Sequence, residues 1–310
     1  MGGRRWSRMA FVVDDEPVSW HVVRSVSGDA LIWREINRRV AGVLGDAIAL
    51  SDERLLSDVE VARCVRTLRI ELGLFAAEDF EHWLTARDLS SADVTEWVQH
   101  GPRGARAMEV AEPGAGQPPE REATWVAGIC TGALRQVARD VAASEAVHRH
   151  LAEIGATVAR DEALALFTRL VADSAPVDRI IAGHVLEWTL IEGDWVTFTS
   201  DTAAREALLC VRDDGLTLSQ VASEAGTSVC PRTFLLEDVE DTLAIACRSA
   251  REGDAVGPIA IRDGVAIGVV TTKALPSATL PEVRARARAH AVARAVDDLV
   301  RKRVRWCESG

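Results

Sequence analysis

The chain has 310 residues, of which 48% are hydrophobic and 27% charged, and this balance is typical of a folded globular protein rather than a disordered one. Its formal net charge of −11 disfavours tight binding to the phosphates of nucleic acid, which needs a positive surface. The six cysteines contain no CxxC pair, which favours free thiols over a disulfide framework or a zinc site.

The N-terminal segment lacks the pattern of a secretory signal. Basic residues are followed only by Phe11-Val12-Val13 before an acidic run at Asp14-Asp15-Glu16. A signal peptide needs an apolar stretch of about 7–15 residues. A membrane-spanning helix needs about 18, and no run of the sequence comes near that length. We therefore expect a cytoplasmic protein that does not enter a membrane.

The N-terminal half predicts a mainly helical body. Two apolar runs, Phe11–Val13 and Trp20–Val23, predict short strands. Apolar residues at helical spacing then predict helices over 29–45, 51–73, 76–89 and 90–98, with Ser51 as one N-cap and Ser90 with Asp93 as a capping box. Residues 101–122 are rich in Gly and Pro and predict a flexible linker. Helical spacing resumes from Thr124 to about Asp173, with a break near Gly155.

The pattern changes to mixed strand and helix from about residue 184. Two strands are predicted over 185–191 and 195–199, joined by a turn at 192–194, and helices follow over 202–212, 218–224 and 236–252. Residues 257–262 and 265–271 predict a hairpin around Asp263-Gly264, because both residues tolerate the positive φ of a tight turn. Pro281 then opens one long helix to about Arg303.

Three runs within this half resemble the parvulin (PpiC-type) family of peptidyl-prolyl isomerases. They are Asp201-Thr-Ala-Ala-Arg-Glu-Ala-Leu-Leu, Asp213-Asp-Gly-Leu-Thr-Leu-Ser-Gln-Val-Ala and Arg251-Glu-Gly-Asp-Ala-Val-Gly-Pro-Ile. The predicted order of elements over 195–273 (strand, helix, short helix, helix, strand, tight turn, strand) is also similar to that of the family. The resemblance implies a parvulin-like α+β domain over residues 184–275.

The rest of the chain resembles the helical body of SurA-type chaperones, in which the isomerase domain is inserted before a final helix. The run from Leu72 to Leu84, with the following Asp88–Val94, is similar to parvulin-related peptide maturation proteins of bacterial pathways for ribosomally made peptides. The expected fold is therefore α+β. A body of residues 1–183 carries the inserted domain, and a C-terminal helix within 276–310 packs back on that body.

This sequence departs from the family at the positions that matter for catalysis. The resemblance places the two histidines of the family at Trp195 and Ala266, and the apolar residues that hold the substrate at Val239 and Leu243. It therefore implies loss of isomerase activity and survival of an apolar groove. We expect no catalytic residue, no metal and no cofactor, and a peptide-binding site made of six residues: Trp195, Thr197, Phe198, Val239, Leu243 and Ala266.

Other candidate residues are better explained as structural. His148 and His150 are two residues apart on a predicted helix, so their rings point in different directions and do not form a metal pair. The acidic runs 14–16 and 237–241 have the composition of a cation or basic-peptide site but are also typical of a solvated turn and a helix start. The strands predicted at 185–191 and 195–199 would offer an edge for strand addition by a peptide.

Three functional hypotheses follow. The first is a non-catalytic protein that holds a precursor or unfolded peptide during maturation, with peptide-modifying enzymes as further partners. The second is an isomerase with a rebuilt site that uses Thr197, Thr199, Cys230 or Asp254. The third is a general chaperone or partner subunit.

Overall fold

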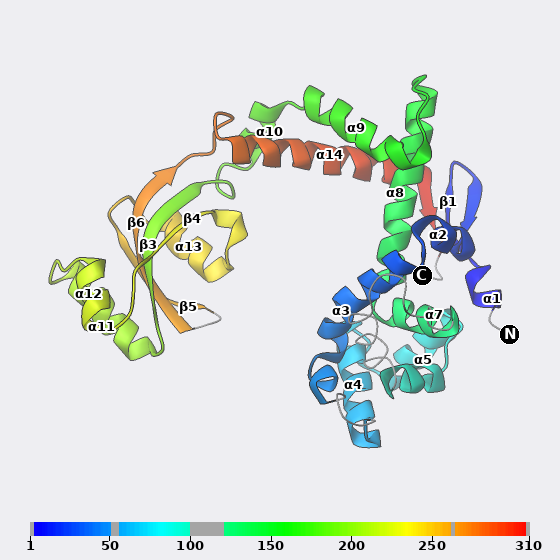
Figure 1. Cartoon of the computed structure of the whole chain (residues 1–310), viewed down its shortest axis with the longest axis horizontal. Coiled ribbons are helices and arrows are strands. Elements are labelled where there is room, and N and C mark those ends of the chain that lie inside the picture. The colour runs from blue at the N-terminus through cyan, green and yellow to red at the C-terminus, as the bar shows by residue number, and fades with distance from the viewer. Residues whose placement is uncertain (1–2, 51–55, 100–120, 262–263, 308–310) are drawn as a thin grey trace. The chain divides into compact units, whose positions relative to one another are not determined.

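The computed structural model describes residues 3–50, 56–99, 121–261 and 264–307. The chain forms two compact units (Figure 1): unit 1 comprises residues 1–168 and 295–310, and unit 2 comprises residues 169–294. Unit 1 is mainly helical with a small sheet, and unit 2 is built on a four-stranded sheet. The protein is therefore mixed helix and sheet.

The described residues of unit 1 form the helices α1 (Gly3–Trp6), α2 (Trp20–Ser27), α3 (Asp29–Leu50), α4 (Asp58–Glu71), α5 (Ala77–Ala86), α7 (Arg121–Cys130), α8 (Ala133–Glu153) and the first part of α9 (Arg160–Ser174), and residues 91–99 are also helical. From α3 onward these helices lie near the positions that apolar periodicity predicts, whereas α1 and α2 are not predicted. The capping box of Ser90 and Asp93 is confirmed, since each backbone N–H donates to the other side chain. Ser51 and residues 101–120 of the predicted linker lie outside the described residues.

Three predictions for unit 1 are wrong. The helix expected to stop at Gly45 continues to Leu50. The helix expected to open at Ser51 begins at Asp58, with Ser57 as its N-cap. The run Trp20–Val23, expected as a strand, opens helix α2, because the Ser19 side chain accepts a hydrogen bond from the Val22 N–H at 3.4 Å and caps the helix. Trp20 and Val23 are three residues apart and both buried, which fits helical rather than strand spacing.

The sheet of unit 1 joins the two ends of the chain. Its strand order is β2 (Glu16–Ser19), β1 (Met9–Val13) and β7 (Val304–Trp306), and both pairings are antiparallel. Strand β7, which the sequence analysis does not predict, sets Val304 opposite Val13 and Trp306 opposite Phe11. Residues 304–306 therefore complete a sheet that begins almost 300 residues earlier in the chain.

Arg303 fixes this junction through charge. Its side chain is 5% exposed, donates to Asp14 at 2.6 Å, and also pairs with Glu153 at the end of α8. The neighbouring acids are paired in the same way, Asp15 with Arg305 at 2.6 Å and Glu16 with Arg149 at 2.5 Å. The acidic run 14–16 is an exposed turn, as expected, and each of its acids is also paired with an arginine of the same unit.

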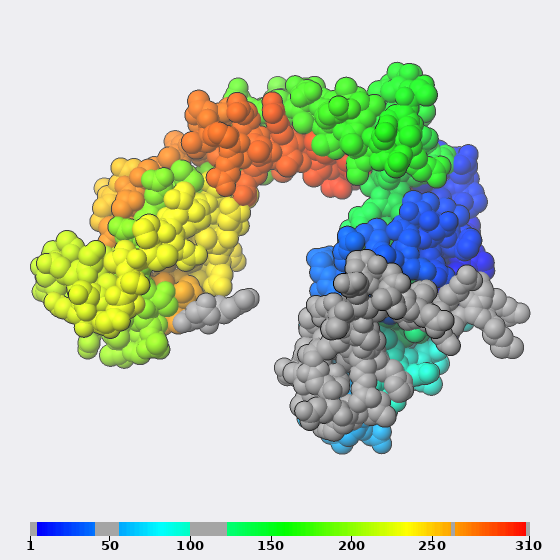
Figure 2. Space-filling model, viewed as in Figure 1, coloured from blue at the N-terminus to red at the C-terminus, as the bar shows by residue number. Residues whose placement is uncertain are grey.

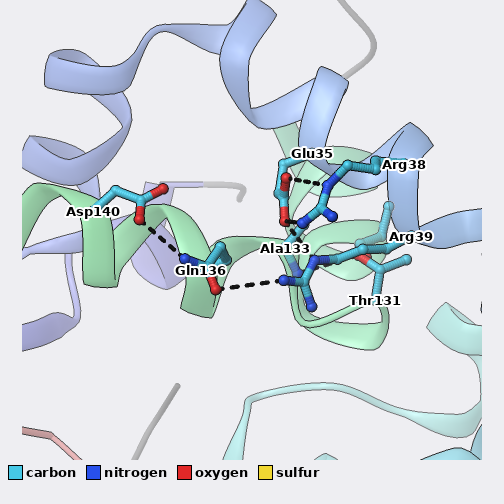
Figure 3. Close-up of polar contacts among 8 residues, drawn as sticks. Glu35, Arg38, Arg39, Thr131, Ala133, Gln136 and Asp140 are labelled. Carbon is cyan, nitrogen blue, oxygen red and sulfur yellow. Dashed lines mark hydrogen bonds and ion pairs between the residues drawn. The ribbon is translucent and has the colours of Figure 1, made fainter. Parts of the chain in front are cut away.

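Helices α3 and α8 of unit 1 are also joined by polar contacts (Figure 3). Arg39 of α3 donates to Gln136 of α8 at 3.5 Å, and Gln136 in turn donates to Asp140 at 3.0 Å. Within α3, Glu35 accepts from Arg38 at 2.6 Å and from Arg39 at 2.5 Å. The hydrogen bond from Arg38 lowers the pKa of the Glu35 carboxyl, against the opposing effect of its burial.

Unit 2 contains a four-stranded antiparallel sheet in the order β4 (Cys230–Leu235), β3 (Leu190–Phe198), β6 (Gly264–Ala274) and β5 (Ala255–Ile261). The connecting helices are α11 (Asp201–Arg212), α12 (Leu218–Glu224), the short 3-10 helix η1 (Leu236–Asp238) and α13 (Asp241–Ser249). The predicted elements occur in the predicted order, and β4 is an additional strand. The helix predicted over 236–252 is confirmed only over α13, because η1 and an extended segment at Val239 take the place of its first turns.

The predicted pair of strands at 185–191 and 195–199 is also wrong. Residues 184–189 form turns, and β3 runs without interruption through Glu192, Gly193 and Asp194. Gly193 is needed for close approach and not for a turn, since a Cβ there would lie 2.6 Å from the Val269 carbonyl oxygen. Because β3 pairs on both sides, it offers no edge for strand addition; the outer strands are β4 and β5.

Helices cover both faces of this sheet. Figure 1 shows α11 and α12 on one face and α13 on the other. The packing agrees, because Val196 and Phe198 pack with α11 and α12 while Ile191 and Trp195 pack with α13. In the space-filling view, the segment from α12 to α13, coloured yellow-green to yellow, covers much of the visible face of unit 2 (Figure 2).

A second polar cluster in unit 2 fixes the start of the last helix. Helix α14 (Pro281–Arg303) begins and ends as the sequence predicts. Its Arg286 pairs with Glu237 and, at 2.9 Å, with Asp238, and the Trp188 indole donates to Glu237 at 2.8 Å. These contacts give part of the acidic run 237–241 a structural partner.

One negative finding concerns membranes. Among the helices of the described residues, none combines the length and apolar character that crossing a bilayer requires.

The Arg303 contacts predict a stability difference between two neighbouring arginines. Replacing Arg303 by Met should lower the free energy of unfolding of unit 1 by about 1–2 kcal/mol, because it removes the charge-assisted hydrogen bonds of a buried guanidinium group. The matched variant R305M removes an arginine that is 72% exposed, and should change stability by less than about 0.5 kcal/mol. Urea unfolding followed by circular dichroism measures both. Equal effects of the two variants would contradict the account.

The same contact predicts a dependence on pH. The hydrogen bond from Arg303 lowers the pKa of Glu153, so its stabilising effect is complete above the usual glutamate pKa of about 4.3 and is lost as pH falls through the lower pKa of the folded state. The stability difference between the parent and R303M should therefore shrink below about pH 4. A difference that stays constant between pH 7 and pH 3 would show that the carboxylates do not contribute.

Candidate functional site

Strand β3 carries three of the six residues expected to bind peptide. Because successive side chains of a strand point to opposite faces of the sheet, the three do not all lie on the same face. Trp195 and Thr197 lie on one face of the sheet, because side chains two residues apart on a strand share a face. Phe198 lies on the other face, where it packs with Ala204 and Leu208 of α11. The expectation that Phe198 contributes to the same site is therefore wrong.

Four of the expected residues meet in one apolar cluster between the sheet and α13. Trp195, Leu243 and Ala266 are buried there with 2%, 4% and 2% of their surfaces exposed, and Val239 packs against them partly buried. Val239 reaches the cluster from the extended segment between η1 and α13, not from a helix as expected. Thr197 is exposed and lies opposite Ala266 in the sheet.

Two glycines determine how Trp195 lies. The residue directly opposite it on β6 is Gly268, and a Cβ there would lie 2.5 Å from Cε3 of the Trp195 ring. A Cβ on Gly193 would lie 3.2 Å from the indole Nε1. The ring therefore lies against bare backbone on both strands, with the Phe234 ring beside it at a centroid distance of 5.9 Å.

The indole N–H of Trp195 is an orphan donor. Its Nε1 is buried and has no hydrogen-bond partner in the described part of the chain. Buried donors are nearly always paired, since an unpaired one costs about 1–3 kcal/mol. Three of the residues that pack around the cluster, Phe234, Val239 and Ile261, are only partly buried, so the cluster has an apolar rim that solvent reaches.

The cluster is poorly equipped for acid–base chemistry. Its buried members are apolar except for the Cys247 thiol, and burial raises the pKa of Cys247 to about 11, with Lys273 acting weakly in the opposite sense. A thiol with this pKa stays protonated near neutral pH and is a poor nucleophile. The site can hold an apolar group, but its buried residues provide no base.

Lys273 of β6 fixes the end of α13 over this cluster. Its ammonium group donates to three backbone carbonyls at the helix C-terminus, those of Cys247 at 3.1 Å, Arg248 at 2.7 Å and Ala250 at 2.7 Å. These carbonyls have no partner within the helix, and a cation is favoured at the negative end of the helix dipole. Sequence analysis did not single out this lysine.

The residues of the alternative catalytic hypothesis are not brought together. Cys230 lies opposite Trp195 on the outer strand β4, and Thr197 lies opposite Ala266 on β6. Asp254 precedes β5 at the other edge of the sheet, where its carboxylate accepts from the Arg251 N–H at 2.7 Å. Thr199 is exposed beyond the end of β3. No nucleophile–base pair arises from these four residues.

Metal binding finds no support among the described residues. No group of three or more His, Cys, Asp or Glu side chains lies in an arrangement able to hold an ion in this part of the chain. His150 instead packs edge-on against Phe167, with ring centroids 5.9 Å apart.

Sequence reasoning missed four residues that determine the geometry of the Trp195 cluster: Gly193, Gly268, Phe234 and Lys273. Gly193 and Gly268 carry a readable signal, because glycine inside a strand often marks a close approach of another group. Phe234 carries a weaker signal, since its strand contains Pro231 and is only six residues long. The position of Lys273 below α13 depends on tertiary packing that no local pattern records.

Comparisons with known proteins add a distant structural likeness. No protein-family model matches the chain, and a search of curated proteins finds no match. The chain is similar to the peptidylprolyl isomerase PrsA from Bacillus cereus at 9% identity and a TM-score of 0.31, covering 96% of this chain and 91% of that one. It is similar to the foldase protein PrsA from Streptococcus pneumoniae at 10% identity and a TM-score of 0.33, covering 92% and 88%.

A further structure describes SurA-like chaperones of Campylobacter jejuni, to which the chain is similar at 9% identity and a TM-score of 0.22, covering 97% of this chain and 99% of that one. Overlap at these TM-scores does not establish a shared fold. The site is therefore interpreted from its own residues and from the order of its strands and helices.

The Lys273 contacts predict that this residue stabilises unit 2 and protects Cys247. Replacing Lys273 by Met should lower the free energy of unfolding by about 1–3 kcal/mol, because three helix carbonyls lose their donor. It should also speed the reaction of the Cys247 thiol with a disulfide reagent, followed by mass spectrometry of the labelled peptides. The matched variant K302M removes an exposed lysine and should change neither quantity. An unchanged Cys247 labelling rate in K273M would show that the lysine does not fix α13.

Proposed function

We propose that this protein is a non-catalytic, chaperone-like peptide-binding protein, and that unit 2 holds an extended segment of its client at the Trp195 cluster. The observation that carries the proposal is the buried indole N–H of Trp195, which has no acceptor among the described residues and lies beside a partly exposed apolar rim. In this proposal the ring or the rim shifts on binding to expose the N–H. A peptide carbonyl is then a suitable acceptor, and pairing with it recovers the free energy that the unpaired N–H costs.

The rim suits an apolar side chain of the bound peptide. Phe234, Val239 and Ile261 are partly buried around the cluster, and a ligand that covers them gains from the removal of apolar surface from water. Binding pockets for organic ligands are mostly apolar with a few placed polar groups. A single indole donor within an apolar rim fits that pattern and selects no particular charged side chain.

The scarcity of polar side-chain groups in the Trp195 cluster supports a holding role over catalysis. Rotation about a peptide bond has a barrier of about 18–20 kcal/mol, and lowering it requires groups that stabilise the twisted amide. The resemblance to parvulins assigns the family's two histidines to Trp195 and Ala266. Ala266 has no side-chain polar atom, and Trp195 offers a single donor and no acceptor.

The proposed setting is the maturation of a ribosomally made peptide. The run from Leu72 to Leu84, followed by Asp88–Val94, supports it through its similarity to peptide maturation proteins. In this proposal the protein is cytoplasmic, residues 184–275 form the peptide-binding domain, and residues 1–183 with 276–310 form its helical body. Its client is a precursor peptide, which it holds or protects while modifying enzymes act on it.

Binding assays with a conservative variant test the proposal. The probes are fluorescein-labelled peptides encoded by short reading frames beside the gene, and reduced, carboxymethylated α-lactalbumin as an unrelated unfolded chain. Fluorescence anisotropy measures their affinity for the parent, W195F, and T199A as an exposed control near the end of β3. W195F keeps an aromatic ring but loses the N–H, so we expect about tenfold weaker binding, which corresponds to about 1.4 kcal/mol. T199A should bind as the parent does.

The outcomes of these assays distinguish the three functional hypotheses from one another. Equal affinity for the flanking peptides and for α-lactalbumin would indicate a general chaperone and contradict the precursor-specific role. Unchanged binding by a folded W195F would place the peptide elsewhere. A protease-coupled assay on a proline-containing peptide tests the enzymatic alternative, and turnover well above the spontaneous rate would contradict a holding role alone.

A further inference from the structure

A cavity in unit 1 combines unpaired arginines with tryptophans and lies outside the site of the proposed function. Its volume is about 290 Å³, and its lining comes from β1, the start of α2, the segment after α5, α8 and the end of β7. The lining residues are Ala10, Trp20, Arg87, Arg135, Ala138, Arg139, Trp306 and Cys307. The cavity is small, close to the lower end of the range for organic ligands.

None of the three lining arginines pairs with a carboxylate within the described ranges 3–50, 56–99, 121–261 and 264–307. The Arg87 guanidinium donates to the Trp83 carbonyl at 3.2 Å and lies over the Trp83 ring at 4.5 Å. Arg135 and Arg139 are exposed, and neither makes a side-chain hydrogen bond or an ion pair with another described residue. In a chain with a net charge of −11, three converging arginines without an acid are an unusual concentration of positive charge.

The acidic residues next to these arginines in the sequence form contacts with other residues. Asp140, which follows Arg139, accepts from Gln136 at 3.0 Å. Asp88, which follows Arg87, pairs with Arg5 at 3.7 Å. The cluster therefore keeps its charge, and its members repel one another.

This repulsion has a cost that nothing in the described part of the unit offsets. Arg135 and Arg139 are four residues apart on α8, a spacing at which like charges face each other and destabilise a helix. Burial, with the charges of Arg135 and Arg8, lowers the pKa of Arg87, so this guanidinium also lies in an unfavourable field. An anion that binds among the arginines relieves both effects at once.

The rest of the lining is apolar or aromatic. Trp306 is 45% exposed and packs edge-on against Phe11, with ring centroids 5.5 Å apart, and Ala10 and Ala138 are buried. Trp20 is also buried, with 1% of its surface exposed. The cavity therefore offers guanidinium groups for an anion and an apolar surface for a hydrocarbon body.

We propose that this cavity binds an organic carboxylate, with the carboxylate on Arg87, Arg135 and Arg139 and its apolar part against Trp306. Guanidinium groups bind carboxylates through paired, charge-assisted hydrogen bonds, which are stronger than neutral ones. The apolar lining favours an organic acid over inorganic phosphate. Two sources provide the same chemistry, a small organic acid and the free C-terminus of a peptide with an apolar last residue.

Calorimetric titration of the full chain tests the site with charged and neutral versions of the same molecule. The small probes are 1-naphthaleneacetate, its neutral amide 1-naphthaleneacetamide, and inorganic phosphate. The peptide probes are acetyl-Ala-Ala-Leu-Phe with a free C-terminal carboxylate and the same peptide amidated. We expect naphthaleneacetate to bind at least tenfold more tightly than its amide, and more weakly as salt is raised.

Variants assign the binding to the cavity. R135Q/R139Q should weaken naphthaleneacetate binding at least tenfold without lowering the thermal midpoint, because it also removes a like-charge pair. The control R63Q/R66Q removes two exposed arginines of α4 in the same unit, and should leave binding within twofold of the parent. W306A should also weaken naphthaleneacetate binding, since it removes the apolar contact.

The same probes show whether the ligand is a small acid or a peptide C-terminus, and they define the results that would overturn the proposal. Tighter binding of the free-carboxylate peptide than of naphthaleneacetate would identify a peptide C-terminus, and the reverse would identify a small acid. Equal binding of acid and amide, equal binding of phosphate and naphthaleneacetate, or full binding by R135Q/R139Q would each overturn the proposal. Trp195 lies in unit 2, so W195F should not change these titrations. The test of the cavity is therefore independent of the test of the proposed function.

Discussion

The buried side chain of Arg303 is the constraint on which the architecture of unit 1 depends. It lies between Asp14 in the turn after β1 and Glu153 at the end of α8, and it directly precedes strand β7. These contacts hold residues from both ends of the sequence in one sheet. Unit 2 is formed by a continuous stretch, residues 169–294. A change at Arg303 therefore acts first on the sheet that joins the two ends of unit 1.

Unit 2 is organised around a different constraint, the close contact of Trp195 with strand backbone. The ring can lie on the sheet only because Gly193 and Gly268 have no side chains. The same contact leaves the indole N–H without an acceptor in the described residues. In the proposed function this unpaired donor is the polar anchor of the site, and Phe234 and Val239 provide its apolar rim. The cluster that this packing creates is the one to which the proposed function assigns the peptide.

The parts of the fold that the sequence predicts are those specified by local chemistry. Pro281 fixes the start of α14, Ser90 and Asp93 cap their helix, and β5 and β6 pair as the hairpin pattern predicts. The misread elements depend on distant partners. Strand β7 has three residues and needs β1 to exist, and β4 contains a proline that is tolerated because the strand lies at the edge of the sheet.

The candidate site was predictable in part for the same reason. Trp195, Val239, Leu243 and Ala266 meet in one cluster, as the resemblance implies, although Val239 comes from an extended segment. Phe198 was assigned to the site in error, and the two-residue period of a strand already places it on the opposite face. The donation of Lys273 to the end of α13, and the arginine cavity of unit 1, depend on tertiary packing and carry no local signal. Both features are defined only by the arrangement of side chains in the folded chain.

The most direct test of the central claim is the behaviour of the Trp195 indole N–H itself. In a ¹⁵N-labelled sample the nine tryptophans give separate indole signals, and the W195F variant assigns the one that belongs to Trp195. On addition of a bound peptide, the account predicts that this signal moves downfield and that its exchange with solvent slows, as the N–H gains a carbonyl acceptor. A peptide that binds while the Trp195 signal stays in place, and signals of other tryptophans move instead, would contradict it.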